Sequence, residues 1–183
     1  MSSSRHHNKI YEYGFSLIEL IITIAIIGIV LSIGTLNFNQ WMVKSRVEAQ
    51  VKQMVSDISE LRIRALTTKQ RHSIVLYPSY YVFKSYSSEK YTSNTDLVAN
   101  GTVVSGGARN VEFRLKLSAT NVVPDTGTAI EINQNGLLAA LPQTIFLATG
   151  ATTSGSVVNC LTIHTARVNI GAQNSTTGVC DDK

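Results

Sequence analysis

The stretch that decides the fold is Phe15–Leu36, with the sequence FSLIELIITIAIIGIVLSIGTL. Nearly every residue in it is apolar, and Glu19 is its one ionisable side chain. About 20 helical residues, each rising about 1.5 Å, cross the hydrocarbon core of a bilayer. The stretch therefore predicts a membrane-spanning helix. A carboxylate within such a helix costs about 3 kcal/mol, which predicts a function for Glu19 and a cationic partner for its charge.

The residues around Glu19 form a specific motif. The segment Gly14-Phe15-Ser16-Leu17-Ile18-Glu19-Leu20 resembles the class III signal of type IV pilins and type II secretion pseudopilins. In that family a prepilin peptidase cuts after the glycine and methylates the new terminus. The resemblance implies removal of residues 1–14 as a leader, cleavage between Gly14 and Phe15, and N-methylation of Phe15. It also implies an assembly role for Glu19, which would pair with the terminal amine of a neighbouring subunit.

Two other interpretations of the apolar stretch stay open. A plain signal anchor explains the hydrophobicity and leaves Glu19 without a reason. A cleaved secretory signal peptide could end at the small residues of Ser32-Ile33-Gly34, although its apolar core is usually about 7–15 residues long, which is shorter than this run.

The charges that flank the stretch predict its orientation. Arg5 and Lys9 precede it and favour a cytoplasmic amino terminus, whereas Lys44 and Arg46 follow it and weaken the bias. With the resemblance, this predicts a single-pass inner-membrane protein whose globular head, residues 72–183, lies in the periplasm. The mature chain would then enter a periplasmic or extracellular filament with other pilin or pseudopilin subunits.

The helix is predicted to continue past the membrane as an amphipathic segment. Residues 15–40 would form the membrane and filament-core half, and residues 41–71 the amphipathic half. One apolar face recurs at spacings of three and four, formed by Val47, Val51, Met54 or Val55, Ile58, Leu61 and Ala65. The opposite face would carry Lys52, Gln53, Asp57, Glu60 and Arg64, with ion pairs Lys44–Glu48 and Glu60–Arg64. The alternative is two helices separated near Gly34, Asn37 and Asn39, which are weak helix formers.

Residues 72–183 have the period of two that is typical of strands. The predicted strands are 72–77, 80–86, 97–105, 111–117, 129–133, 142–148 and 157–170, with a turn at Asn135-Gly136. The predicted fold class is α+β, in which a long N-terminal helix packs against an antiparallel sheet or sandwich. The tyrosines at 77, 80, 81 and 86 are expected to pack across strands, with an adhesive aromatic surface as the other interpretation.

Cys160 and Cys180 are the only cysteines. A disulfide is the economical interpretation for an exported domain, and closing that loop would contribute about 3 kcal/mol. Free buried thiols and a metal site remain as alternatives, although a zinc site needs four ligands and the histidines are scattered. We expect no metal and no cofactor.

A second, weaker resemblance lies near the carboxyl end. The run Ala166-Arg167-Val168-Asn169-Ile170-Gly171 is similar to the tail of GspH/FimT-type minor pseudopilins, which usually has a Gly-Arg-Val-Arg-like strand. Here Ala166 stands for the glycine and Asn169 for the second basic residue. The resemblance implies a minor pilin or pseudopilin of a type IV pilus or type II secretion filament.

Two other function classes compete with a structural subunit. Some FimT-like proteins act in DNA uptake, so DNA binding is the alternative, with Arg167, Arg109, Arg114 and Lys116 as candidate contacts. It is not favoured, because phosphate binding needs clustered cations and the net charge of +4 lies mainly in the helix. Enzyme activity is not expected, because His72 and His164 are isolated and no catalytic motif accompanies them.

Overall fold

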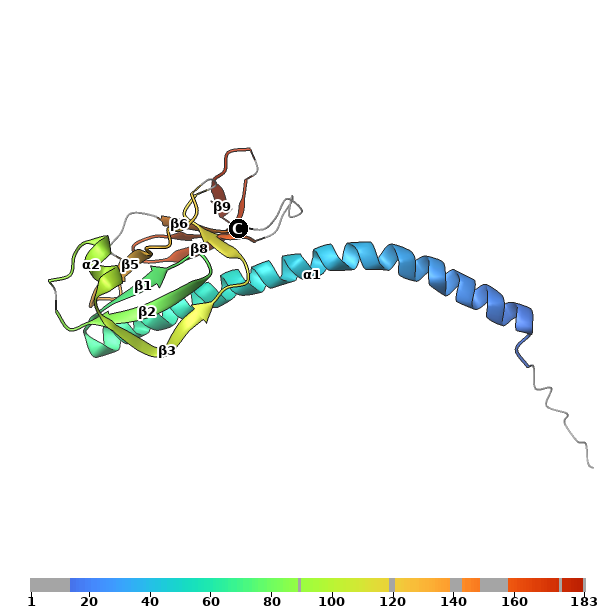
Figure 1. The fold of residues 1–183 in the computed structure, drawn as a ribbon, viewed down its shortest axis with the longest axis horizontal. Helices are drawn as coiled ribbons and strands as arrows, with labels where there is room; N and C mark the ends of the chain where they lie inside the picture. The colour runs from blue at the N-terminus through green and yellow to red at the C-terminus, as the bar shows by residue number, and fades with distance from the viewer. Residues whose placement is uncertain are drawn as a thin grey trace, which may run out of the picture. The chain divides into compact units, whose positions relative to one another are not determined.

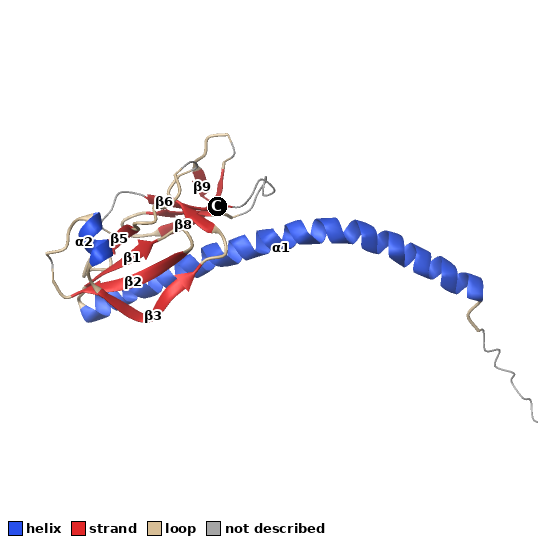
Figure 2. Cartoon of the chain, viewed as in Figure 1, coloured by secondary structure: helices blue, strands red, loops and turns tan. Residues whose placement is uncertain are grey.

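The computed structural model describes residues 14–88, 90–118, 121–138, 143–148, 158–174 and 176–182, without the side chains of residues 33–37 and 105. Almost all of the predicted leader, residues 1–14, is outside this range. The chain divides into two compact units, residues 1–39 and residues 40–183. The described residues form an α+β structure of two helices and nine strands (Figures 1 and 2).

The first helix, α1, spans Leu17–Thr68 and is 52 residues long. It is one uninterrupted element, as predicted, and the alternative of two helices separated near Gly34 is wrong. Lys69 follows with φ of 55°, the left-handed conformation in which many helices end.

The apolar face predicted for the second half of α1 is confirmed. Its buried members are Val47, Val51, Met54, Ile58, Leu61 and Ala65. Two predictions about the opposite face are wrong. Asp57 is buried, with only 3% of its surface exposed. Glu48 pairs with Lys52 at 2.7 Å instead of with Lys44, whereas Glu60 pairs with Arg64 at 2.7 Å as predicted.

Two antiparallel sheets complete the unit of residues 40–183. The four-stranded sheet has the order β3-β2-β1-β5, with bounds Thr102–Asn110, Tyr80–Tyr86, Arg71–Leu76 and Thr128–Ile132. The five-stranded sheet has the order β4-β6-β7-β8-β9, with bounds Arg114–Lys116, Gln143–Ala148, Cys160–Ile163, Val168–Gln173 and Cys180–Asp182.

The core is formed by the apolar face of α1 and by side chains from both sheets, among them Ile74, Phe83, Ile130, Leu147 and Leu161. All six residues of β1 are buried. Because alternate strand residues point to opposite faces, β1 must be covered on both sides. The second helix, α2 (Asn94–Ala99), packs on β1 and β5 and supplies part of that cover (Figure 1).

The helix α2 corrects the prediction of a strand over residues 97–105. Ser93 caps it, since its side-chain Oγ accepts from the Asp96 amide at 3.1 Å. Leu97 is its one buried residue among those described, and β3 begins only at Thr102. The Ser-x-x-Asp capping signal of this helix is present in the sequence at Ser93–Asp96.

Two other strand boundaries also differ from the prediction. The strand predicted over 111–117 is reduced to β4, because the amides of Glu112 and Phe113 bond to the Gln50 side chain and that of Val111 to Ser79. The strand predicted over 157–170 is a hairpin of β7 and β8, closed where the His164 amide donates to the Arg167 carbonyl at 2.8 Å. Its turn contains no glycine or proline that could have predicted it.

Candidate processing and assembly site

The segment with the predicted cleavage point is Gly14–Ser16, which precedes α1 and has no regular secondary structure. The Leu20 amide donates to the Ser16 carbonyl at 3.2 Å and closes the first helical turn. A Cβ built on Gly14 would meet no described atom within 4 Å. The described residues therefore give no packing reason for a glycine here, so a requirement for glycine at this position would come from another molecule.

Glu19 lies in the first turn of α1. An acid there interacts favourably with the helix dipole, by about 0.3–1 kcal/mol. That gain is smaller than the roughly 3 kcal/mol that burial of its charge in lipid would cost. Within the described part of the chain, its carboxylate makes no hydrogen bond or ion pair, so Glu19 is open to a partner.

The other polar side chains of this unit behave differently. Thr23 Oγ1 donates to the Leu20 carbonyl at 2.8 Å, and Ser32 Oγ donates to the Gly28 carbonyl at 2.9 Å. Hydroxyls bonded to their own helix can enter an apolar environment without losing a partner. Glu19 is thus the polar group of residues 17–32 that the helix itself does not satisfy.

Apolar side chains surround Glu19 on every side of the helix. Twelve large apolar residues between Phe15 and Leu31 are 48–77% exposed. A helix that is apolar all round is normally buried against something else. Within the described residues, no helix combines the length and the apolar character needed to cross a bilayer.

The Asp57 cluster is a buried polar site that the sequence prediction missed. Tyr81 Oη donates to Asp57 Oδ2 at 2.6 Å, and Gln53 Nε2 donates to Oδ1 at 2.8 Å. Arg109 Nε lies 3.9 Å from Oδ2. Burial and the bond to Asp57 strongly raise the pKa of Tyr81. The sequence did contain a signal that Asp57 is buried. Asp57 is three residues after Met54 and four before Leu61, so it lies at the margin of the buried apolar face of α1.

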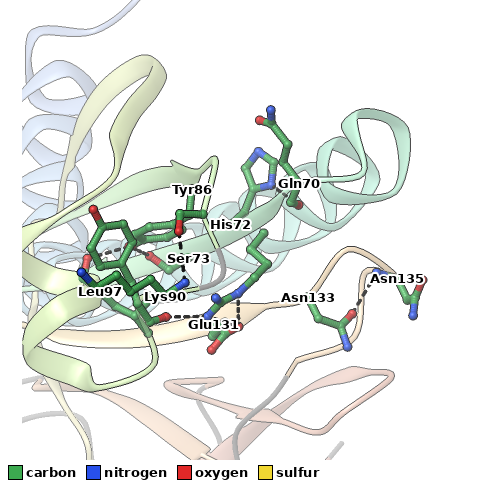
Figure 3. Close-up of polar contacts among 12 residues, drawn as sticks. Gln70, His72, Ser73, Tyr86, Lys90, Leu97, Glu131, Asn133 and Asn135 are labelled. Carbon is green, nitrogen blue, oxygen red and sulfur yellow. Dashed lines mark hydrogen bonds and ion pairs between the residues drawn. The ribbon is translucent and has the colours of Figure 1, made fainter.

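A second polar network holds the segment of α2 against the four-stranded sheet (Figure 3). Arg71 pairs with Glu131 at 2.6 Å and donates to the Tyr91 carbonyl at 2.7 Å. Tyr86 Oη donates to the Leu97 carbonyl at 2.6 Å, so Ser73 must donate to Tyr86, at 2.7 Å. These contacts satisfy polar groups that α2 would otherwise bury without partners.

Ionisable groups at the same segment are perturbed by burial. Burial raises the pKa of Tyr86 and lowers the pKa of Lys84. The Lys84 ammonium donates to the carbonyls of Val98 and Asn100, at the end of α2. Cations at a helix carboxyl end are favourable, so this contact supports α2. His72 also bonds locally, with Nδ1 2.9 Å from the Gln70 carbonyl.

The predicted disulfide is confirmed, since Cys160 and Cys180 are bonded. It connects β7 to β9 across β8, where Gly171 pairs with Cys160. A Cβ on Gly171 would lie 2.3 Å from the Asp181 carbonyl oxygen and 2.9 Å from Cys180 Sγ. A glycine is therefore required at position 171 because β9 approaches its Cα closely, and not because of its backbone conformation. Across the described ranges, no group of three or more His, Cys, Asp or Glu residues could hold a metal ion.

The four candidate DNA contacts lie in three places. Arg109 is on β3 near Asp57, in the four-stranded sheet. Arg114 and Lys116 are on β4, where Arg114 is opposite Ala148 at one end of β6. Arg167 follows Ile163, which is opposite Gln143 at the other end of β6. Gln143 and Ala148 are about 17 Å apart along β6, at about 3.4 Å per residue. This register brings Arg114 and Lys116 together and separates them from Arg167.

With this geometry in view, the comparisons with known proteins identify the class of the N-terminal site. Residues 11–35 match the family model of the prokaryotic N-terminal methylation motif. That motif is the signature of type IV pilins and pseudopilins. The matched range contains Gly14, Phe15 and Glu19. No curated protein and no solved structure matches the chain.

Proposed function

We propose that the chain is the precursor of a structural filament subunit of the pilin type. The observation that carries the proposal is the match of residues 11–35 to the methylation motif. The Glu19 carboxylate has no partner within the part of the chain that the structure describes, and exposed apolar residues surround it. Both features support the proposal, because neighbouring copies of such a helix would supply a countercharge and apolar contacts.

In this proposal, processing and insertion precede assembly. The apolar stretch Phe15–Leu36 anchors the precursor in the inner membrane, with the amino terminus in the cytoplasm and residues 72–183 in the periplasm. A prepilin peptidase hydrolyses the peptide bond between Gly14 and Phe15, and the new amine of Phe15 is methylated. The open space at Gly14 and the lack of regular secondary structure at residues 14–16 support this step, because a peptidase needs access to the bond that it cuts. The Cys160–Cys180 disulfide supports export, since disulfides persist in oxidising compartments.

Assembly then gives Glu19 its partner. When the helix leaves lipid, its apolar side chains would be exposed to water unless other helices cover them. Packing against neighbouring helices therefore offsets the free-energy cost of leaving lipid. The carboxylate fixes the register of the helices by meeting the terminal amine of the next subunit. This role explains why one acid is kept among twelve exposed apolar side chains.

At a finer level, we propose a GspH/FimT-type minor pilin or pseudopilin of a type IV pilus or a type II secretion filament, acting as a structural subunit without enzymatic activity. The support is the sequence of β8 and the turn before it, Ala166–Gly171. DNA binding is not part of the proposal, because Arg167 and Arg114 lie at opposite ends of the five-stranded sheet.

Processing is tested on the protein recovered from cells. Mass spectrometry of the mature chain should find Phe15 as a methylated amino terminus. Replacing Gly14 with Leu should leave a precursor 14 residues longer, whereas the matched control Gly28→Ala should be processed normally, since a Cβ there also meets open space. A wild-type chain that keeps its first 14 residues in cells would refute the proposal.

Assembly is tested separately from processing. Glu19→Val should be cut and inserted but should not enter filaments. Thr23→Val is the control, because the Thr23 hydroxyl bonds only to its own helix among the described residues, and we expect it to assemble. Normal incorporation of Glu19→Val would remove the pairing role and leave the processing claim standing.

A further inference from the structure

The first residues of the unit formed by residues 40–183 are not covered by its core. Val43 is partly buried against the core and Val47 is fully buried, so the packing of α1 against the sheets begins there. Directly before them, Trp41 is 62% exposed and Met42 is 38% exposed. The sheets therefore leave these two large apolar side chains exposed at the point along α1 where the packing starts.

The chemistry of these residues is that of a lipid interface. Trp41 is the only tryptophan of the chain. Tryptophan concentrates at the headgroup level of bilayers, because its ring is apolar and its N–H needs a polar partner. Lys44 is three residues further on, on the same side of the helix, and its long stem allows the ammonium to reach lipid phosphates.

The neighbouring cation, Arg46, is already in an ion pair. Arg46 pairs with Glu112 at 2.6 Å, and the Gln50 side chain accepts from the amides of Glu112 and Phe113. These contacts bind the connection between β3 and β4 to α1. Among the described residues, Lys44 makes no ion pair, so it is the cation of this region that is open to a phosphate.

We propose that Trp41 and Met42 lie at the headgroup–acyl boundary of a phospholipid bilayer, with Lys44 among the phosphates. The proposal rests on the membrane anchoring proposed above, and it adds the residues that fix the depth of the chain. The apolar stretch Phe15–Leu36 ends five residues before Trp41, so the hydrocarbon ends where the interfacial residues begin.

The single tryptophan makes the proposal measurable in the full chain. The protein is reconstituted into vesicles of phosphatidylethanolamine and phosphatidylglycerol whose acyl chains carry bromine near the carbonyl end or near the methyl end. Flotation of the vesicles reports anchoring independently. Two variants move the reporter: Trp41→Phe with Ser45→Trp, one turn and about 6 Å along the helix, and Trp41→Phe with Thr95→Trp, in the exposed part of α2.

We expect the Trp41 emission to shift to shorter wavelength on reconstitution and to be quenched more by the shallow bromines than by the deep ones. The Ser45→Trp reporter should be quenched less, and the Thr95→Trp reporter not at all. Deep quenching above shallow quenching would overturn the proposal, as would a floating chain in which neither bromine quenches Trp41. Emission that shifts only at high protein density, without bromine quenching, would assign Trp41 to a contact with another chain instead. A chain that does not float would refute the anchoring itself.

Discussion

Replacing Tyr81 with Phe removes one hydroxyl and tests whether the buried Asp57 carboxylate depends on it. Tyr81 Oη is 2.6 Å from Asp57 Oδ2, and both residues are only 3% exposed. After the change, the carboxylate keeps the Gln53 amide at 2.8 Å, while Arg109 at 3.9 Å is too far for a hydrogen bond. Water has little access to replace the lost donor.

The size of the effect follows from the charge of the acceptor. A hydrogen bond to a charged group contributes about 1.5–3 kcal/mol, more than a neutral pair, because its loss leaves a buried charge poorly solvated. We expect Tyr81→Phe to lower the free energy of unfolding by about 2 kcal/mol. For a chain of this size, that corresponds to a Tm lower by about 4–8 °C.

The assay is denaturant and thermal unfolding of the full chain in detergent, followed by near-UV circular dichroism. Tyr80→Phe is the matched control. It is the same chemical change one residue away, on a half-buried ring stacked on Tyr77, and it should stay within about 0.5 kcal/mol of wild type. A double-mutant cycle with Asp57→Asn should give a coupling of about 1 kcal/mol or more. Equal effects of Tyr81→Phe and Tyr80→Phe, or a coupling near zero, would refute the argument.

Three further predictions concern the disulfide and the buried phenols. Replacing Cys160 and Cys180 with Ser should lower the free energy of unfolding by about 3 kcal/mol, measured by denaturant unfolding, and an unchanged midpoint would contradict this. Gly171→Ala should cost about 1–3 kcal/mol and slow oxidation of the two thiols in a thiol-labelling assay, whereas rapid oxidation would show that the added Cβ fits. Burial raises the pKa of Tyr81 and Tyr86 above 10.0 in the folded chain. The stability that their protonated phenols contribute is therefore complete below pH 10.0 and is lost as the pH rises through their pKa values in the folded chain. In an alkaline titration, the phenolate absorbance of these two should appear only as the chain unfolds, and ionisation near pH 10.0 in a native-like chain would contradict it.

Sequence periodicity predicted the elements whose signals are local. The run Phe15–Leu36 and the spacing from Val47 to Ala65 depend on neighbours within one or two turns, so the single helix and its buried face could be predicted. The strands β1, β2, β5 and β6 contain enough β-branched and aromatic residues to be predicted near their observed bounds. The processing motif is likewise local, and the family model matches the same residues.

Boundaries decided by distant partners could not be predicted in this way. Gln50 binds the amides of Glu112 and Phe113 from 62 and 63 residues away, and this contact shortens the predicted strand over 111–117. The apolar residues Leu97 and Val98 are compatible with a strand, but the Ser93 cap and the Tyr86 contact to the Leu97 carbonyl favour a helix.

The sequence by itself determined where this chain is apolar, where one acid interrupts that run, and which face of the helix is buried, because hydrophobicity and helical period belong to each segment alone. Only the tertiary structure decided that Asp57 faces Tyr81 across 24 positions, that Arg71 meets Glu131 across 60, and that Arg114 and Arg167 lie apart. The physical reason is register: the pairing of the strands decides which distant side chains meet, and no local pattern contains it.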